Sequence, residues 1–304
     1  MRLRLVLLAV LLLSLPAVAS RAAPPGFAFL EIPTGVRAAA LGGAYASLAE
    51  GAEAAFWNPA GLQATRGLQM TGGHTEWFEK LRHDHFAVAG RMFGGGIAAS
   101  IRALYSEPIE ERDELGNLIG SFGAHDLEFG LGYGRALGAG LSLGGSAQII
   151  RERISNLAAT TYGFGGGVTW QPAPWPGLRL SVIGQNLGPA ATYMIDGVKG
   201  QPVSLPAAVQ TGGSYTVALG SRFQVSGALE GRLVRGRSAM TFVGSEIMDP
   251  SGAALRVGMR FNDSASTLSF GAGYTMSALR LDYAFVPLRY DLGDTHRFGF
   301  TARF

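Results

Sequence analysis

The sequence predicts an all-β fold, a transmembrane antiparallel β-barrel of about 14 strands with a short, partly helical N-terminal plug in its lumen. From about residue 67 onward, apolar and polar residues alternate with period two in many short segments, which is the pattern of β-strands. The composition is 47% hydrophobic and only 15% charged, so a large apolar surface must face something other than water. Beyond the N-terminus no apolar run reaches the ~18 residues of a spanning helix, which leaves closed strands to carry that surface.

The N-terminus has the pattern of an export signal. Arg2 and Arg4 precede an apolar run over residues 5–13, and Ala17-Val18-Ala19 supplies the small residues that a signal peptidase needs. A retained membrane anchor is the alternative, but it needs roughly 20 apolar residues and about ten are present. We therefore expect a signal peptide over residues 1–19, a plug segment over residues 20–66 and an outer-membrane barrel over residues 67–304.

The cysteine content and the charge exclude disulfide bonds, a lipid-modified cysteine and a nucleic-acid partner. The chain has no cysteine, so it has neither disulfide bonds nor a lipid-modified cysteine. Of its 25 basic residues, Arg2 and Arg4 lie in the expected signal, which leaves 23 basic residues against 22 acids. The remaining arginines are scattered singly among apolar neighbours, which excludes a nucleic-acid partner.

The alternation is clearest over residues 126–134, where Leu127, Phe129 and Leu131 share one parity while polar residues and glycines hold the other. The same division recurs over 141–149, 161–170, 222–230 and 255–262. A soluble β-sandwich would alternate as well. However, these strands run about nine to thirteen residues, whereas soluble strands average about five or six and a tilted membrane crossing needs about nine to eleven. Aromatic residues near the strand ends are typical of a membrane interface: Tyr105, Tyr133, Trp170, Tyr274 and Tyr283.

About fourteen segments carry this pattern, an even number as a single-chain bacterial barrel requires. They are 67–78, 83–93, 95–106, 122–135, 140–152, 160–171, 177–187, 206–218, 221–233, 238–248, 253–262, 267–276, 278–286 and 295–304. The two longest connections, 107–121 and 188–205, both follow odd strands, so we expect them outside the cell and both barrel ends in the periplasm. The 45 glycines fall mainly on the polar parity, which leaves room in the lumen for water or a plug.

The last expected strand has a distinctive apolar parity. Phe298, Phe300 and Phe304 alternate with polar residues or glycine, and a C-terminal aromatic on such a strand resembles the signal by which barrel-assembly machinery recognises its clients. The alternative is an edge strand of a soluble sheet that happens to end in Phe.

Residues 26–62 do not alternate and form a distinct segment before the barrel. Pro59 disfavours a helical conformation at Asn58, so a short helix should end there. Four groups of residues in this region stand out: Phe29-Leu30, Val36-Arg37-Ala38, Leu41-Gly42-Gly43-Ala44-Tyr45 and Phe56-Trp57-Asn58-Pro59-Ala60-Gly61-Leu62. Together they resemble the start of the PorV/PorQ family of outer-membrane proteins, which belongs with the FadL-like barrels.

That resemblance implies a plug folded into the lumen. Its motif residues, wedged against the inner wall before the first strand, would be Trp57, Asn58, Pro59, Ala60 and Gly61. In FadL relatives a plug and a lateral gap in the wall pass hydrophobic molecules, whereas PorV relatives serve the type IX secretion system and receive exported cargo. The modest chain length favours the PorV role, with the FadL-like passive channel for hydrophobic small molecules as the alternative.

Signals for catalysis, metals and cofactors are weak. The pair His83 and His85 would point the same way from a strand, but two ligands are too few for a metal site, and polar residues at the outer end of the second strand explain them. Three more histidines, His74, His125 and His296, would need a nucleophilic serine close by to form a catalytic pair. The nearest serine, Ser121, lies about 13 Å along the chain from His125 if both are on one strand.

Two further patterns have simple structural explanations. Residues 163–167 lack the Lys-Ser/Thr and the helix of a phosphate-binding loop. The acidic stretch 107–114 is explained by a solvated outer loop, although a partner or cation surface is the alternative. We therefore expect no enzyme, no cofactor and no metal. The expected partners are outer-membrane lipid, barrel-assembly machinery, and either secretion-system proteins with their cargo or a hydrophobic small molecule.

Overall fold

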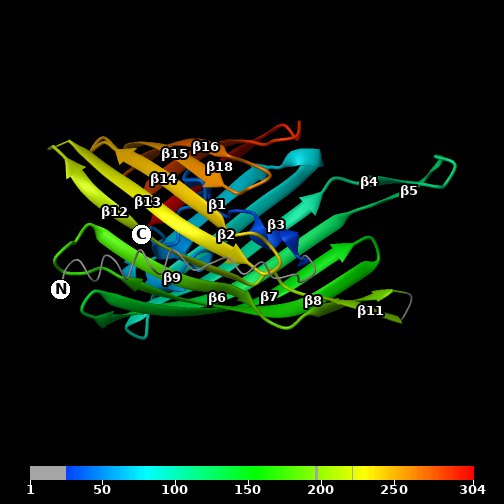
Figure 1. Cartoon of the computed structure of the whole chain (residues 1–304), viewed down its shortest axis with the longest axis horizontal. Helices are drawn as coiled ribbons and strands as arrows, with labels where there is room; N and C mark the ends of the chain where they lie inside the picture. Colours follow the sequence, from blue (N-terminus) through cyan, green and yellow to red (C-terminus); the bar gives the residue numbers. More distant parts are fainter. Residues whose placement is uncertain (1–24, 196–197, 221) are drawn as a thin grey trace.

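The computed structural model, which describes residues 25–195, 198–220 and 222–304, is a closed antiparallel barrel of 14 strands (Figure 1). Neighbouring strands are mostly consecutive in sequence, and β1 pairs with β18 to close the wall. The barrel predicted from the alternation is therefore confirmed, and each of the fourteen segments expected from the sequence overlaps one strand of the wall. In order around the wall the strands are β1 (Gln69–Glu76), β2 (Leu81–Met92), β3 (Gly95–Ser106), β6 (Ala124–Gly138), β7 (Leu141–Ile154), β8 (Leu157–Trp170), β9 (Leu178–Leu187), β12 (Ala208–Leu219), β13 (Phe223–Val234), β14 (Met240–Met248), β15 (Ala253–Phe261), β16 (Leu268–Met276), β17 (Leu279–Pro287) and β18 (Asp294–Arg303).

The two faces of the wall differ as the alternation requires. In β15, Leu255, Val257 and Met259 face outward and are exposed, while Arg256 and Arg260 face the lumen and are buried. The same separation holds along β6, where Leu131 is 64% exposed and Glu128 is 4% exposed. An apolar exterior around a polar interior is the reverse of a soluble barrel and is typical of a barrel surrounded by lipid.

The two ends of the barrel are built differently. At one end, which we call the turn end, the strands are joined by tight turns such as Phe93-Gly94, and both residues there have positive φ. The other end, the loop end, carries the long connections. The expected loops 107–121 and 188–205 are not structureless, because they contain the hairpins β4 (Ile109–Arg112) with β5 (Leu118–Phe122) and β10 (Ala191–Ile195) with β11 (Val198–Val203). Both hairpins project past the rim of the barrel (Figure 1).

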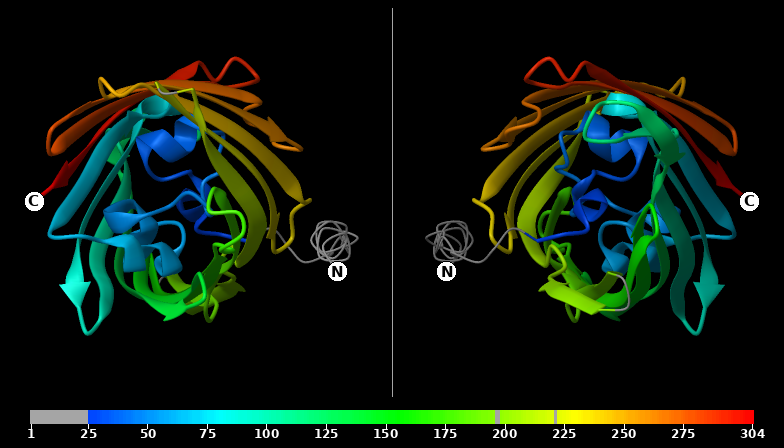
Figure 2. Two further views of the ribbon diagram at one scale, coloured as in Figure 1. Left: turned by 90° about the vertical axis from the view of Figure 1, so that its left-hand side faces the viewer. Right: turned by 90° about the vertical axis from the view of Figure 1, so that its right-hand side faces the viewer.

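The N-terminal segment lies inside the barrel, as Figure 2 shows by the blue ribbon within the ring of strands. It consists of short pieces: η1 (Ala28–Glu31), α2 (Val36–Ala40), η2 (Gly51–Ala55) and η3 (Pro59–Ala64), with η4 (Phe78–Lys80) following β1 outside the plug. The helix expected to end at Asn58 is instead a 3₁₀ helix that ends at Ala55, and Asn58 has extended backbone. The signal peptide predicted over residues 1–19 lies outside the described residues. Among the described residues, no helix has the length and apolar character needed to cross a membrane.

Candidate functional site

Trp57, the first residue of the plug motif, contacts other residues of the plug. Its indole Nε1 donates to the carbonyl oxygen of Thr34 at 2.7 Å, and its ring packs edge-on against Tyr45 with centroids 5.8 Å apart. Trp57 is only 5% exposed, so its one polar atom would be costly to bury without this partner. The contact ties the start of the plug to its end.

Asn58 is the junction between the plug and the wall. Its side-chain oxygen accepts from the backbone N–H of Ala60 at 3.1 Å and caps η3, whose first residue is Pro59. Its Nδ2 donates to the carbonyl of Ala46 at 3.0 Å and to Oγ1 of Thr169 on β8 at 2.9 Å. The side-chain amide of Asn58 therefore forms hydrogen bonds with the first turn of η3, with a plug loop and with a barrel strand.

Glycines on the inner wall make room for the plug backbone. A Cβ on Gly134 of β6 would overlap the carbonyl oxygen of Pro59, and one on Gly144 of β7 would overlap the peptide that joins Pro59 to Ala60. On the opposite side a Cβ on Gly258 of β15 would overlap the backbone at Leu41 and Gly42. These three lumen-facing glycines are thus contact surfaces for the plug.

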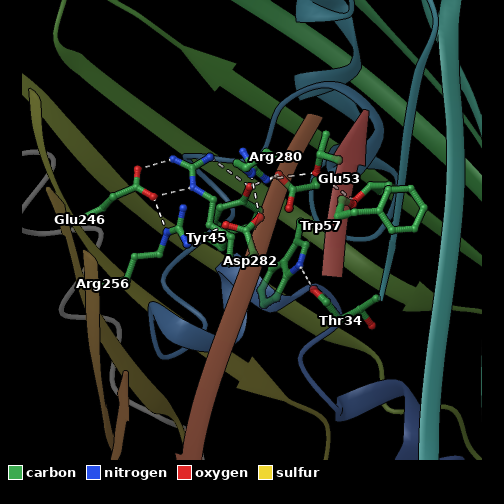
Figure 3. Close-up of polar contacts among 12 residues, drawn as sticks. Thr34, Tyr45, Glu53, Trp57, Glu246, Arg256, Arg280 and Asp282 are labelled. Atoms are coloured by element: carbon green, nitrogen blue, oxygen red, sulfur yellow. Dashed lines mark hydrogen bonds and ion pairs between the residues drawn. The ribbon is translucent and has the colours of Figure 1, made fainter. Parts of the chain in front are cut away.

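A network of six alternating charges fixes the plug to three strands (Figure 3). On the wall, Arg256 of β15 bonds to Glu246 of β14 at 2.5 Å and to Asp282 of β17 at 2.8 Å. Arg37 of the plug bonds to Glu246 at 2.6 Å. Arg280 of β17 then links Asp282 to Glu53 of the plug, at 2.7 and 2.9 Å. We call these six residues the charge network: Arg37, Glu53, Glu246, Arg256, Arg280 and Asp282.

The plug end of the charge network has a strongly perturbed carboxyl. Burial by itself would raise the pKa of Glu53, but Arg280, Arg37 and the hydrogen bond that Tyr45 Oη donates at 2.7 Å outweigh it and lower that pKa to about 2. The same burial and the neighbouring carboxylate raise the pKa of Tyr45, which therefore stays protonated and donates. Glu53 is ionised across the physiological range.

Glu230 of β13 provides a second anchor. It is fully buried, and its carboxylate accepts from the backbone N–H groups of Ala46 and Ser47 at 3.0 and 2.8 Å, from Ser47 Oγ at 2.7 Å and from Gln210 Nε2 at 2.5 Å. A single wall carboxylate thereby satisfies two plug amides that have no helix or strand to pair with.

Cavities remain on both sides of the plug. At the turn end an open vestibule of about 700 Å³ is bordered by members of the charge network. At the loop end a cavity of about 420 Å³, which we call the outer chamber, lies between the start of the plug and four wall connections. A smaller cavity of about 60 Å³ lies deeper, next to Trp57, and shares the segment Glu31 to Pro33 with the outer chamber as a lining.

The histidines of β2 lie elsewhere than expected. His83 and His85 do share a face, but that face is the lumen, where they are 1% and 7% exposed, so they are core residues under the plug and not polar residues at a solvated strand end. His85 packs edge-on against Phe56 of the plug, with ring centroids 5.4 Å apart. Within the described part of the chain, no group of three or more potential ligands could hold a metal ion.

The other candidate histidines lie on the outer face, and none of them has a hydrogen bond to a serine among the described residues. His74 bonds to Asp84 at 2.6 Å and to Glu76 at 3.1 Å, and His296 bonds to the hydroxyl of Tyr283 at 2.8 Å. No hydrogen bond joins His125 to Ser121 among the described residues, and the two lie on different strands, β6 and β5.

The remaining sequence patterns have clear positions. Residues 163–167 lie within β8, in agreement with the strand explanation. The acidic stretch 107–114 runs into the hairpin β4–β5. Phe298, Phe300 and Phe304 point outward from the last strand segment, with 57%, 37% and 73% exposure.

Sequence reasoning singled out residues 57–61 of the plug but missed the buried charges of the inner wall, including those of the charge network. A signal was present, because Glu128, Glu230, Glu246, Arg256 and Asp282 all fall on inward parities of strands whose other parity is apolar. Ionised groups there need partners inside the barrel. The identity of those partners depends on the path of the plug, and the plug sequence has no periodicity that predicts this path.

Comparison with known proteins supports the fold. A model of an uncharacterised protein family, UPF0164, matches residues 19–150, and no curated protein matches the chain. Among solved structures, the chain is similar to the CymD monoaromatic hydrocarbon channel (14% identity, TM-score 0.61, 89% of this chain and 97% of that one). It is also similar to the toluene transporter TbuX of Ralstonia pickettii (15%, 0.60, 89% and 98%) and to a FadL homologue of Pseudomonas aeruginosa (12%, 0.54, 93% and 99%). The fold is therefore that of FadL-like outer-membrane channels.

Proposed function

We propose that this protein is a passive channel of the bacterial outer membrane for hydrophobic small molecules, and not an enzyme. The observation that carries the proposal is a closed barrel with an apolar exterior whose lumen holds an internal plug between two cavities. Similar structures are named as hydrocarbon channels and toluene transporters. Since those likenesses are low in identity, they support the architecture, and the choice of solute rests on the cavities of this chain.

The outer face of the wall supports a position in the membrane. The outward side chains form an apolar band, and a charge on that face would be costly in lipid. We place the loop end outside the cell, since long connections lie there in such barrels. We also propose that Phe298, Phe300 and Phe304, exposed on the outer face, form the element that barrel-assembly machinery binds.

The plug lies between the vestibule and the outer chamber, so we propose a lateral exit for solutes. The wall is irregular between β8 and β9, where the register shifts between Phe164 and Gly166 and where Asn186 has a φ of 56°. Asn186 also lines the small cavity beside Trp57, so the irregular wall lies directly outside that cavity. β8 pairs with β9 only from Phe164 onward, and the hairpin β10–β11 takes over the neighbouring position.

The test is uptake of toluene into liposomes that contain the purified mature barrel. We expect faster uptake than in empty liposomes, and equal rates would overturn the proposal. The chain has no cysteine, so a disulfide can separate plug movement from a lateral route. A Cβ on Gly299 of β18 would lie 3.4 Å from the Cβ of Val36 in α2, close to the ~3.5–4.5 Å of a disulfide. Oxidised V36C/G299C should still take up toluene; uptake that returns only after reduction would place the route through the plug instead.

A second function, an accessory role in protein export of the PorV type, is favoured by one observation. The hairpin β4–β5 projects from the loop end and exposes apolar side chains there, with Leu115 at 87%, Leu118 at 60% and Ile119 at 60%. Such a ribbon suits the docking of cargo or secretion-system proteins. Replacing residues 109–122 by a short turn should then leave cargo in the periplasm, while normal surface delivery would count against this role.

A further inference from the structure

The outer chamber has an excess of arginine over carboxylate. Arg237, Arg260 and Arg297 line it, and the acids that line it are Glu31 and Asp263. Arg237 lies 2.8 Å from Glu31, and Arg260 lies 3.2 Å from Asp263. Arg297 has no described carboxylate within ion-pair distance, so the chamber holds one positive charge more than it neutralises.

Two of these arginines are buried with N–H groups unused. Arg297 is 1% exposed; its Nη1 donates to the carbonyl of Pro33 at 2.8 Å, and its Nε and Nη2 have no partner among the described residues. Arg260 is 8% exposed; its Nε donates to the carbonyl of Gly42 at 3.0 Å, while its Nη2 is likewise without a partner there. A buried guanidinium N–H without an acceptor is costly, and an entering anion would remove that cost.

The rest of the lining is mixed, with the polar side chains of Ser238, Asn262, Ser264 and Ser266 beside a group of apolar ones. The ring of Trp77 lies under the Arg297 guanidinium, 5.0 Å from Cζ to the ring centroid, and Ile32, Met240 and Val286 border the same space. The volume of about 420 Å³ lies in the range of small-molecule sites and suits a compact body such as one aromatic ring. Two guanidinium groups with a planar donor fork match a carboxylate in shape.

We infer that the outer chamber binds a compact amphipathic carboxylate, such as an arylalkanoic acid, with Arg297 and Arg260 on the carboxylate and Trp77 against the apolar body. The inference rests on the proposed channel function and names its substrate class. It departs from an uncharged hydrocarbon, which would leave the unused N–H groups buried and unpaired. Arg237 is occupied by Glu31 and serves at the rim of the chamber.

The test is calorimetric titration of the purified mature barrel in maltoside micelles with phenylacetate and with uncharged 2-phenylethanol. We expect wild type to bind the acid at least tenfold more tightly than the alcohol. Arg297→Gln and Arg260→Gln should each remove that preference and leave alcohol binding unchanged, whereas Arg297→Lys should restore part of it. Arg289→Gln, at an exposed loop position, is the matched control and should keep the wild-type ratio.

The possible outcomes separate the two proposals. Equal affinity for acid and alcohol in wild type would overturn the inference even if toluene uptake proceeds. A preserved preference for the acid in a barrel that fails to take up toluene would keep the binding site and remove the channel for hydrocarbons. Inorganic phosphate that displaces phenylacetate at equal concentration would show a general anion site, such as one for lipid phosphate, and would also overturn it. Heat-dependent gel mobility identifies any variant that fails to fold, in which case Arg260→Gln and Arg297→Lys carry the test.

Discussion

The two halves of the lumen treat charge differently. In the turn-end half the charge network holds three arginines and three carboxylates, and each is paired within 2.9 Å. In the loop-end half the outer chamber holds three arginines and two carboxylates, so one arginine, Arg297, has no described carboxylate partner. The paired charges of the network hold the plug in place without a ligand, whereas the excess positive charge of the outer chamber can be neutralised by an anionic ligand. The first half therefore serves closure and the second serves recognition.

The largest expected effect is on the free energy of unfolding, when one arginine in each half of the lumen is replaced by methionine. Arg280→Met leaves Glu53 and Asp282 buried with fewer partners, and breaking a buried pair in this way costs about 3–5 kcal/mol of unfolding free energy. Arg297→Met removes one hydrogen bond, to the carbonyl of Pro33, together with a buried charge that has no described carboxylate partner. These two effects oppose each other, so the loss of stability should be clearly smaller than for Arg280→Met. Urea unfolding in micelles, followed by tryptophan fluorescence, measures both. Equal losses would erase the contrast between the two halves.

Acid should weaken the turn-end half next. The pKa of Glu53 is lowered from an ordinary value of 4.5 to about 2 in the folded chain, so the unfolded state binds the proton more tightly. Stability from this group is fully present above about pH 4.5 and is lost as the pH falls through about 2, with a total of about 3 kcal/mol from the shift. The measurement is the difference in urea midpoint between wild type and Glu53→Gln from pH 6 to pH 2.5. The difference should shrink as the pH falls, and a constant difference would refute the assignment.

Backbone contact is the other means of closure at the turn end. Gly134→Ala places a Cβ against the carbonyl of Pro59, and overpacking of this kind costs about 1–3 kcal/mol. Gly227→Ala on β13 is the control, because a Cβ there meets no atom of the described residues within 4 Å. Urea midpoints should fall for the first variant and stay near wild type for the second. Similar midpoints for both would mean that the plug backbone does not rest on the wall.

The strands of the wall could be predicted from the sequence, whereas the path of the plug could not, and the reason is physical. A strand that separates two solvents must alternate, so Leu255 to Arg260 shows its register in the sequence and β15 could be placed to within a residue. The plug contacts barrel on all sides and therefore has no such period. Asn58 and Pro59 could be identified as a turn, but the partner of Asn58 on β8, Thr169, is 111 residues away and follows only from the fold.

The same limit applies to the two hairpins and to the inner charges. Residues 109–112 and 118–122 pair with each other outside the barrel, where no burial imposes a polar and an apolar face, so alternation is weak there. The inward position of Glu246 follows from its parity, whereas its two arginine partners come from a neighbouring strand and from the plug. Parity tells which side a charge faces, and only closure of the barrel tells what it meets.

The smallest effect tests whether the charge network tolerates the loss of one shared hydrogen bond. Tyr45 Oη donates to Glu53 at 2.7 Å and accepts from Arg37 Nη1 at 3.3 Å, but Glu53 keeps Arg280 and Arg37 keeps Glu246 after Tyr45→Phe. Because no ion is left unpaired, the loss should be that of one hydrogen bond, about 0.5–1.5 kcal/mol. The hydroxyl also helps to lower the pKa of Glu53, so in Tyr45→Phe the acid-induced loss of stability should be smaller than in wild type and should be complete at a higher pH. A loss as large as that of Arg280→Met would mean that the hydroxyl, and not the pairing of charges, holds the plug in the turn-end half.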